Sequence, residues 1–133
     1  MAELKIDTND ANEIIDISNR INAAIPASFS NGICHLFCTH TTAAITVTEK
    51  VDPDVKHDII AKLDKMIPAK EPYYLHSGGN SAAHIKTILV GSSLSIPIKN
   101  GNLELGPWQG VCLCEFDGPR SRKVKVVCQK LED

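Results

Sequence analysis

This chain lacks the features that mark membrane, secreted and nucleic-acid-binding proteins. It contains no apolar run that approaches the roughly 20 residues needed to span a bilayer. Residues 1–10 contain neither the basic segment nor the apolar segment of a secretory signal. We therefore expect a cytoplasmic protein with no membrane partner. The net charge of −2 argues against a nucleic-acid partner, because neutralising phosphates requires an excess of basic residues.

The five cysteines include no CxxC pair, which disfavours a structural zinc ribbon. Cys34 and Cys38 fall in one strand-like run, Cys112 and Cys114 in a second, and Cys128 in a third. The expected role of these thiols is that of small buried hydrophobic groups in a reducing compartment.

The bulk composition is that of an ordinary globular protein. Hydrophobic residues make up 43% of the 133 residues and charged residues 23%. A chain of this length can bury a core without disulfides or structural metals, and no linker divides it. We therefore expect one domain over residues 1–133.

The periodicity of apolar residues predicts an α+β fold. A strand at 4–7 precedes a helix-like pattern that begins within 8–18 and ends at Ile25-Pro26. Strands are expected at 33–38 and 43–48, and a helix from Pro53 to about Met66 with Asp52 as its N-cap. A short helix over 82–90, with Ser81 as its possible N-cap, is followed by a hairpin at Asn100-Gly101. The runs 111–116 and 124–131 are predicted to pair as strands across the 117–120 turn.

His40 is the first candidate for chemistry. It interrupts two apolar strands in the company of Thr39, Thr41 and Thr42, whose hydroxyls can bond a ligand or the second imidazole nitrogen. The alternative is a histidine that these hydroxyls satisfy locally. We favour the functional interpretation, with Thr41 as a ligand contact, because the polar quartet stands between otherwise apolar segments.

A glycine-rich loop precedes the third helix-like segment. Its residues Gly78, Gly79, Asn80 and Ser81 would leave backbone N–H groups at a helix start, where phosphate or carboxylate binds. His76 and His84 bracket this loop. Together with His40 they could form a three-imidazole metal site with an open position.

Acidic and basic side chains complete the candidate set. Asp54 is our preferred functional acid, able to hold Mg²⁺ or to orient a histidine, although acids at a helix start also stabilise the helix. Glu115 is interpreted equally well as a buried acid or as a solvated residue. Arg120 and Arg122 could clamp phosphate, with a solvated turn as the alternative. His35 and His57 have positions typical of structural residues.

In this order along the chain, these motifs closely resemble the YjbQ family, whose members are described as secondary thiamine-phosphate synthases. The resemblance covers nearly the whole sequence. It depends on the following runs: His40-Thr41-Thr42-Ala43-Ala44, Asp52-Pro53-Asp54-Val55, Gly79-Asn80-Ser81, Ala83-His84-Ile85-Lys86, Gly91-Ser92-Ser93, Asn100-Gly101, Leu105-Gly106-Pro107-Trp108-Gln109 and Asp117-Gly118-Pro119-Arg120.

The resemblance implies a two-sheet β-sandwich of about seven strands with two or three helices, assembled as a homotrimer with pockets near the subunit contacts. It implies weak thiamine-phosphate synthesis, in which a thiazole phosphate attacks the methylene of a pyrimidine diphosphate and displaces pyrophosphate. The shared polar positions of the family match His40, Asp54, His76, His84 and Glu115.

The working hypothesis is an enzyme whose partner is a small phosphorylated metabolite. The Gly78–Ser81 loop and Arg120 would hold phosphate, while His40 and His84 would bind or transfer protons. A divalent metal, Mg²⁺ or Zn²⁺, would neutralise the diphosphate. Two alternatives stay open: a metal-dependent hydrolase of a phosphorylated metabolite, and a non-catalytic trimer that binds a metal or an anion.

Overall fold

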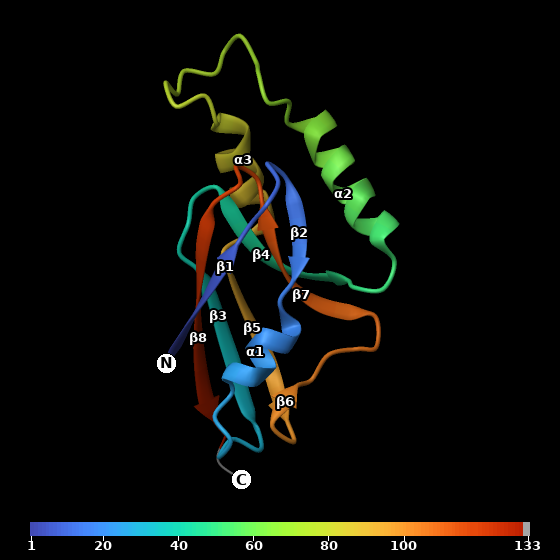
Figure 1. Cartoon of the computed structure of the whole chain (residues 1–133), viewed down its shortest axis with the longest axis vertical. Coiled ribbons are helices and arrows are strands. Elements are labelled where there is room, and N and C mark those ends of the chain that lie inside the picture. Colours follow the sequence, from blue (N-terminus) through green and yellow to red (C-terminus); the bar gives the residue numbers. More distant parts are fainter. Residues whose placement is uncertain (132–133) are drawn as a thin grey trace.

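Two antiparallel sheets form the body of the molecule, whose computed structural model describes residues 1–131 (Figure 1). The larger sheet has the strand order β1 (Ala2–Asp7), β8 (Ser121–Lys130), β3 (Gly32–Cys38), β5 (Ser93–Lys99) and β6 (Asn102–Leu103). The smaller sheet has the order β2 (Glu13–Asp16), β7 (Gln109–Glu115) and β4 (Ala43–Glu49). The helices are α1 (Ser18–Ala24), α2 (Pro53–Met66) and α3 (Ser81–Val90). The prediction of an α+β fold with two sheets is confirmed.

The main core lies between the two sheets, where alternate residues of their strands meet. Successive residues of a strand point to opposite faces, so β3 buries Cys34 and Leu36, and β8 buries Val124 and Val126 on one face. Leu113 of β7 belongs to the same apolar cluster. This packing holds β7 against the five-stranded sheet without hydrogen bonds between their backbones.

A second apolar cluster covers the other face of the smaller sheet. It contains Ala44, Cys112, Cys114 and Phe116, together with side chains of α2 and α3. Strand β7 is therefore buried on both faces, from Gly110 to its last residue. This explains why residues 110–114 contain no charged or strongly polar side chain and show no alternation.

Two local predictions are confirmed in detail. Helix α2 begins at Pro53 and ends at Met66, and the Asp52 side chain accepts a hydrogen bond from the Asp54 backbone N–H at 2.9 Å. The hairpin between β5 and β6 turns at Asn100 and Gly101, which both have positive φ angles (52° and 80°). Positive φ at both central positions is the reason why Asn-Gly marks such turns.

The helix predicted from the pattern that begins within residues 8–18 is wrong in its first half. Ile14 and Ile15 belong to strand β2, which pairs with β7, and α1 begins only at Ser18. The four isoleucines at 14, 15, 17 and 21 fit a helix as well as a strand followed by a helix. Pairing with β7 decides between the two, because it uses backbone groups that a helix would bond internally.

The predicted pairing of 111–116 with 124–131 is also wrong. Strand β7 pairs with β2 and β4, whereas β8 pairs with β1 and β3, so residues 117–120 cross from one sheet to the other. The two strands face each other across the core instead, because Leu113 and Val124 must reach the same apolar cluster.

Within residues 1–131, no helix is both long and apolar enough to cross a membrane.

Candidate functional site

His40 lies in the loop between β3 and β4, at the edge of a polar pocket of about 420 Å³. The pocket is lined by His40, Thr42, Pro119, Arg120, Ser121 and Arg122. Pro119 and Arg120 belong to the segment that crosses between the sheets, and Ser121 and Arg122 begin β8. The crossing segment and the start of β8 thus bring Arg120 and Arg122 to the histidine from about 80 residues farther along the chain. Thr41 is exposed, and it is Thr42 that lines the pocket.

The hydrogen bond of His40 defines its tautomer. Its Nε2 atom accepts the backbone N–H of Lys123 at 2.9 Å, so Nε2 carries no proton and the neutral ring carries its proton on Nδ1. Burial, followed by the positive charge of Arg122, lowers the pKa of His40 below its ordinary value. His40 is therefore a neutral hydrogen-bond donor through Nδ1–H at physiological pH.

Arg122 is held in place by a buried carboxylate. Glu115 is fully buried and accepts hydrogen bonds from Arg122 Nε (2.8 Å) and Nη2, from the Thr8 hydroxyl (2.7 Å) and from the Asp117 backbone N–H (3.0 Å). Arg122 Nη2 also donates to the hydroxyl (2.9 Å) and the carbonyl (3.2 Å) of Thr42. The ion pair therefore ties the start of β8 to the loop that carries His40.

Glu115 stays ionised in this network. Burial by itself raises the pKa of its carboxyl, but the hydrogen bonds from Arg122, Asp117 and Thr8 outweigh burial and leave the pKa below its ordinary value. Because Glu115 already accepts these bonds and does not line the pocket, its placement suits a residue that positions Arg122 better than one that transfers a proton.

A second chain of hydrogen bonds joins the pocket to the glycine-rich loop. Arg120 donates to the Asp117 carbonyl through Nε (2.7 Å) and to its Oδ2 through Nη2 (3.0 Å). Asn80 Nδ2 donates to the same Oδ2 at 2.8 Å. Burial opposes ionisation of Asp117, but the bonds from Asn80 and Arg120 prevail and lower its pKa. The loop predicted to hold phosphate is thus connected to the predicted phosphate-binding arginine.

The residues of the glycine-rich loop do not line one common cavity. A Cβ atom on Gly78 would lie 2.8 Å from His76 Nε2, because the imidazole folds back over this glycine, and Gly79 has a φ of +73°. Gly79 and Asn80 line a cavity of about 460 Å³ together with the buried Lys86. Asn80, not Ser81, occupies the N-cap position of α3, and its side chain bonds Asp117 rather than the helix.

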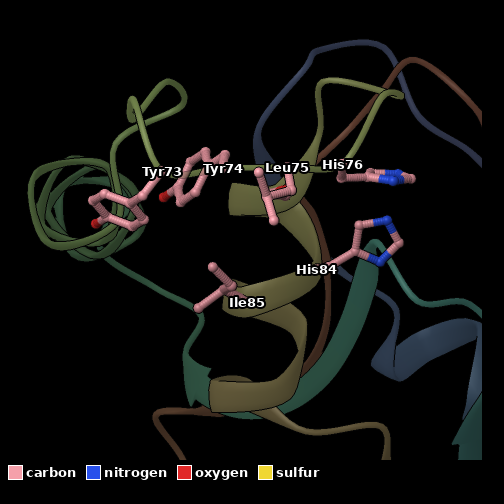
Figure 2. A pocket seen from close by; sticks show the side chains of 7 residues that line it. Tyr73, Tyr74, Leu75, His76, His84 and Ile85 are labelled. Atoms are coloured by element: carbon pink, nitrogen blue, oxygen red, sulfur yellow. The ribbon is translucent and has the colours of Figure 1, made fainter.

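His76 and His84 lie together in a mainly apolar pocket of about 600 Å³ (Figure 2). Their ring centroids are 5.3 Å apart and the ring planes are nearly perpendicular. His84 comes from the first turn of α3 and His76 from the preceding loop, while Tyr73, Tyr74, Leu75 and Ile85 supply the apolar walls. Two imidazoles beside each other can share a proton or supply two ligands to a metal.

One chain does not gather the three predicted histidines. Within residues 1–131, no group of three or more His, Cys, Asp or Glu side chains is arranged to hold a metal ion. His40 lines the polar pocket, and its Nε2 atom already accepts a hydrogen bond from the Lys123 N–H. His76 and His84 share the apolar pocket. A three-imidazole site would therefore need ligands from another copy of the chain.

Asp54 lies apart from both pockets. It lies in the first turn of α2, which follows the end of β4, whereas His40 precedes the start of β4 (Figure 1). A strand of seven residues spans roughly 20 Å. The Asp54 carboxylate lines neither of the two histidine pockets.

The sequence contained a signal for the buried ion pair that the strand predictions did not use. Glu115 is two residues beyond Leu113 on β7, and Arg122 is two residues before Val124 on β8. Residues two apart share a face of a strand, so each charge lies on the same face as core residues. A charge of each sign on facing core surfaces predicts an ion pair. No sequence pattern points to the bond between Asn80 and Asp117 or to that between Lys123 and His40.

Comparison with known proteins places these residues in a family context. The family model described as "UPF0047 protein YjbQ-like" matches residues 2–131. UPF0047 protein YugU of Bacillus subtilis is 42% identical over 120 residues, which cover 90% of this chain and 91% of that protein. A UPF0047 protein of Methanocaldococcus jannaschii is 48% identical over 129 residues, which cover 95% of this chain and 93% of that protein.

Solved structures of similar proteins have the same fold. The crystal structure of an uncharacterised conserved protein of the YjbQ/UPF0047 family from Clostridium acetobutylicum matches with a TM-score of 0.93 and 48% identity, covering 97% of this chain and 100% of that chain. A conserved hypothetical protein from Thermus thermophilus matches with a TM-score of 0.92 and 38% identity, with the same coverage.

Proposed function

Since this chain belongs to the YjbQ-like UPF0047 family, we propose that it is an enzyme that acts on a small phosphorylated metabolite bound in the His40 pocket. The observation that carries this proposal is that His40, whose remaining ring donor is Nδ1–H, lines one pocket together with Arg120 and Arg122. Planar guanidinium groups suit phosphate oxygens, and a neutral imidazole adds a donor without requiring a proton from solution.

Arg122 lines the pocket although its side chain is almost completely buried. Its bonds to Glu115 and Thr42 use Nε and Nη2, so Nη1 is not used by these bonds. Arg120 is about half exposed and is oriented by Asp117. A phosphate in the pocket would thus meet donors that the protein has already oriented, which reduces the cost of binding.

The reaction that the family resemblance suggests is a weak transfer of the thiamine-phosphate synthase type. A thiazole nitrogen attacks the methylene of a pyrimidine diphosphate, the bond from carbon to the diphosphate oxygen breaks, and pyrophosphate leaves with the electron pair. Arg120, Arg122 and His40 would stabilise the negative charge on the departing phosphate oxygens. For a substrate that extends from the His40 pocket past Asn80 to the separate apolar pocket, Tyr73, Tyr74 and Ile85 would shield the planar rings from water.

A divalent metal would neutralise further charge on the diphosphate, but one chain supplies an incomplete set of ligands. His76 and His84 are two ligands, whereas zinc sites take four, of which three usually come from protein at a catalytic centre. We propose that another copy in a homotrimer supplies the missing protein ligand. Exposed apolar residues of this pocket and of α3 support assembly, because Leu75 is 95% exposed and, farther along α3, Ile88 and Leu89 are 80% and 60% exposed.

The His76–His84 pair favours a second candidate, a metal-dependent hydrolase of a phosphorylated metabolite. The protein is purified without a chelator and without a nickel column. Metal analysis then gives the zinc content, light scattering gives the oligomeric state, and together with activity assays they separate the hydrolase from the transferase. Stoichiometric zinc that disappears in His84→Ala, in a trimer that hydrolyses phosphate esters and forms no thiamine phosphate, supports the hydrolase. A trimer without metal removes the reason for that candidate.

The proposed function is tested by turnover and binding in His40→Ala and Arg120→Ala. Release of pyrophosphate from the pyrimidine diphosphate plus thiazole phosphate, and titration calorimetry with pyrophosphate, give the two readouts. The matched control is His57→Ala, because His57 is exposed on α2 outside the pocket. We expect each pocket variant to lose at least about tenfold in affinity, which corresponds to one charge-assisted hydrogen bond.

The outcomes distinguish the proposed classes. If both pocket variants bind pyrophosphate and turn over like the control, the pocket is not the site. Binding that depends on His40 and Arg120, without turnover on a broad panel of phosphate esters, would support the non-catalytic anion-binding alternative in place of the enzyme.

A further inference from the structure

Two cysteines lie directly opposite each other in the five-stranded sheet. Cys34 of β3 and Cys128 of β8 are partners in the antiparallel register. Both are far from the His40 pocket along their strands, since His40 follows the end of β3 and Arg122 stands at the start of β8. Nothing in the proposed function uses these thiols.

The hydrogen-bonding pattern shows which kind of pair they form. The Thr39 N–H donates to the Lys123 carbonyl and the Leu131 N–H donates to the Asn31 carbonyl, both in the same register as β3 and β8. Bonded and non-bonded pairs alternate along an antiparallel ladder. The pairs Thr39–Lys123 and Asn31–Leu131 are therefore bonded pairs, and every second pair between them is bonded as well. Cys34 is five positions from Thr39 and three from Asn31, both odd numbers, so Cys34–Cys128 is a non-bonded pair.

This position matches the geometry of a disulfide. In non-bonded pairs the Cα atoms are about 4.5 Å apart and the side chains are close together. Disulfides join Cα atoms that are about 4.4–6.8 Å apart. A crosslink between these strands therefore needs little backbone movement, and both side chains leave the sheet on the same face, where they belong to the main core.

The two thiols differ in access. Cys34 is completely buried, whereas Cys128 is partly exposed and lines a small cavity of about 140 Å³ with Met1, Ala2 and Pro26. A water molecule takes up about 30 Å³ of liquid, so a molecule the size of hydrogen peroxide fits this cavity. A small oxidant can therefore reach Cys128 first, and Cys34 lies directly behind it.

We propose that Cys34 and Cys128 form a reversible modification site at which hydrogen peroxide generates an intramolecular disulfide between β3 and β8. The Cys128 thiol releases its proton, the thiolate attacks one peroxide oxygen and the O–O bond breaks. The products are a sulfenic acid on Cys128 and a hydroxide, which takes up the released proton and becomes water. The Cys34 sulfur then loses its proton and attacks Cys128 Sγ, and a second water leaves. Two thiols lose two electrons to one peroxide, and a small thiol such as dithiothreitol reverses the reaction by exchange.

The environment of Cys34 makes it the second thiol to react. Burial, followed by the neighbouring charge that Cys128 would carry, raises the pKa of the Cys34 thiol to about 12. Closure of the disulfide therefore accelerates as the pH rises above neutrality, because more of Cys34 becomes thiolate.

The experiment oxidises the intact chain with peroxide, blocks the remaining thiols after denaturation and maps the tryptic peptides. Cleavage after lysine and arginine leaves Cys128 in peptide 126–130 and places Cys34 with Cys38 in peptide 21–50. We expect these two peptides to be joined, with the loss of two hydrogen atoms, in a monomeric band on a non-reducing gel. Dithiothreitol should separate them.

Three variants assign the bond. Cys38→Ser is the matched control, because Cys38 lies on the same strand and in the same peptide, and the crosslink must survive in it. Cys34→Ser must abolish the crosslink and leave a sulfenic acid on Cys128 that dimedone traps, and Cys128→Ser must give neither product. Peptides 21–50 and 126–130 that stay separate at pH 7 and pH 9 would overturn the proposal. A crosslink that persists in Cys34→Ser, or one that joins two chains, would overturn it as well.

Discussion

Replacing Glu115 by glutamine tests whether the buried ion pair holds the His40 pocket together. The substitution keeps the size of the side chain but leaves the Arg122 guanidinium buried without a counter-charge, since both residues are almost completely buried. Removing one partner of a buried pair costs about 3–5 kcal/mol, much more than the loss of a surface pair. For the loss in the free energy of unfolding we take the lower value, about 3 kcal/mol, because the glutamine carbonyl can still accept one hydrogen bond from Arg122.

This free energy corresponds to a large shift in melting temperature. Unfolding entropy is about 2.1 cal/mol/K per residue, which for 133 residues gives about 0.28 kcal/mol/K. A loss of about 3 kcal/mol therefore lowers the Tm by about 11 °C. Urea unfolding at pH 7 and thermal unfolding monitored by circular dichroism give the two values independently. The matched control is Glu3→Gln, which removes an ion pair with Lys125 on the surface of the five-stranded sheet that carries Arg122, and it should leave the Tm close to that of the parent.

The dependence on pH supplies a second check with a defined sign. The folded-state pKa of Glu115 is lowered, so its contribution to stability is complete above the unfolded pKa of about 4.3 and is lost as the pH falls through the folded pKa. The parent should therefore lose stability below about pH 4.3, and the difference between the parent and Glu115→Gln should shrink there. A Tm within about 2 °C of the control at pH 7, or a difference that grows with acid, would refute this account of the network.

Three further predictions concern the pockets. A nuclear magnetic resonance titration should place the pKa of His40 below its ordinary value of about 6.5, with Nδ1 protonated in the neutral form. A pKa above that value contradicts the effect of burial and Arg122, and a proton on Nε2 in the neutral ring contradicts the assigned tautomer. Gly78→Ala should displace the His76 ring, because the new Cβ meets its Nε2, and should change the His76 resonances while the unfolding free energy changes by only about 1 kcal/mol. Asn80→Ala removes one of the donors to Asp117 and should weaken pyrophosphate binding about threefold to tenfold by titration calorimetry. Unchanged affinity would show that the loop and the polar pocket act separately.

Prediction from sequence succeeded where a local signal sufficed. Asp52-Pro53 specified the start of α2, because a side-chain cap and a residue without an N–H meet the requirements of a first turn on their own. Asn100-Gly101 specified the β5–β6 hairpin through the positive φ angles that these residues accept. Prediction failed at 8–18 and at the pairing of β7 with β8, where the outcome depends on which distant strand offers free backbone groups.

The candidate site shows the same division. The sequence marked His40, His76, His84 and Arg120 as polar residues in special local settings, and the structure places each of them at a pocket. It brings His76 and His84 together but leaves His40 with Arg120 and Arg122 in a different pocket, and Asp54 in neither. Residue type and local pattern can identify side chains that are able to bind a ligand or to react. They do not determine which of these side chains lie together in the folded protein.

By itself, the sequence determined the elements with strong local rules, the α+β class and a short set of polar residues. The tertiary structure alone decided the partners: that Lys123 binds His40 Nε2, that Glu115 neutralises Arg122, and that Asp117 joins Arg120 to Asn80. The physical reason is the distance along the sequence over which each interaction acts. Caps, turns and periodicity act over a few residues, whereas these contacts form only after two sheets pack face to face and bury charges that must then find partners.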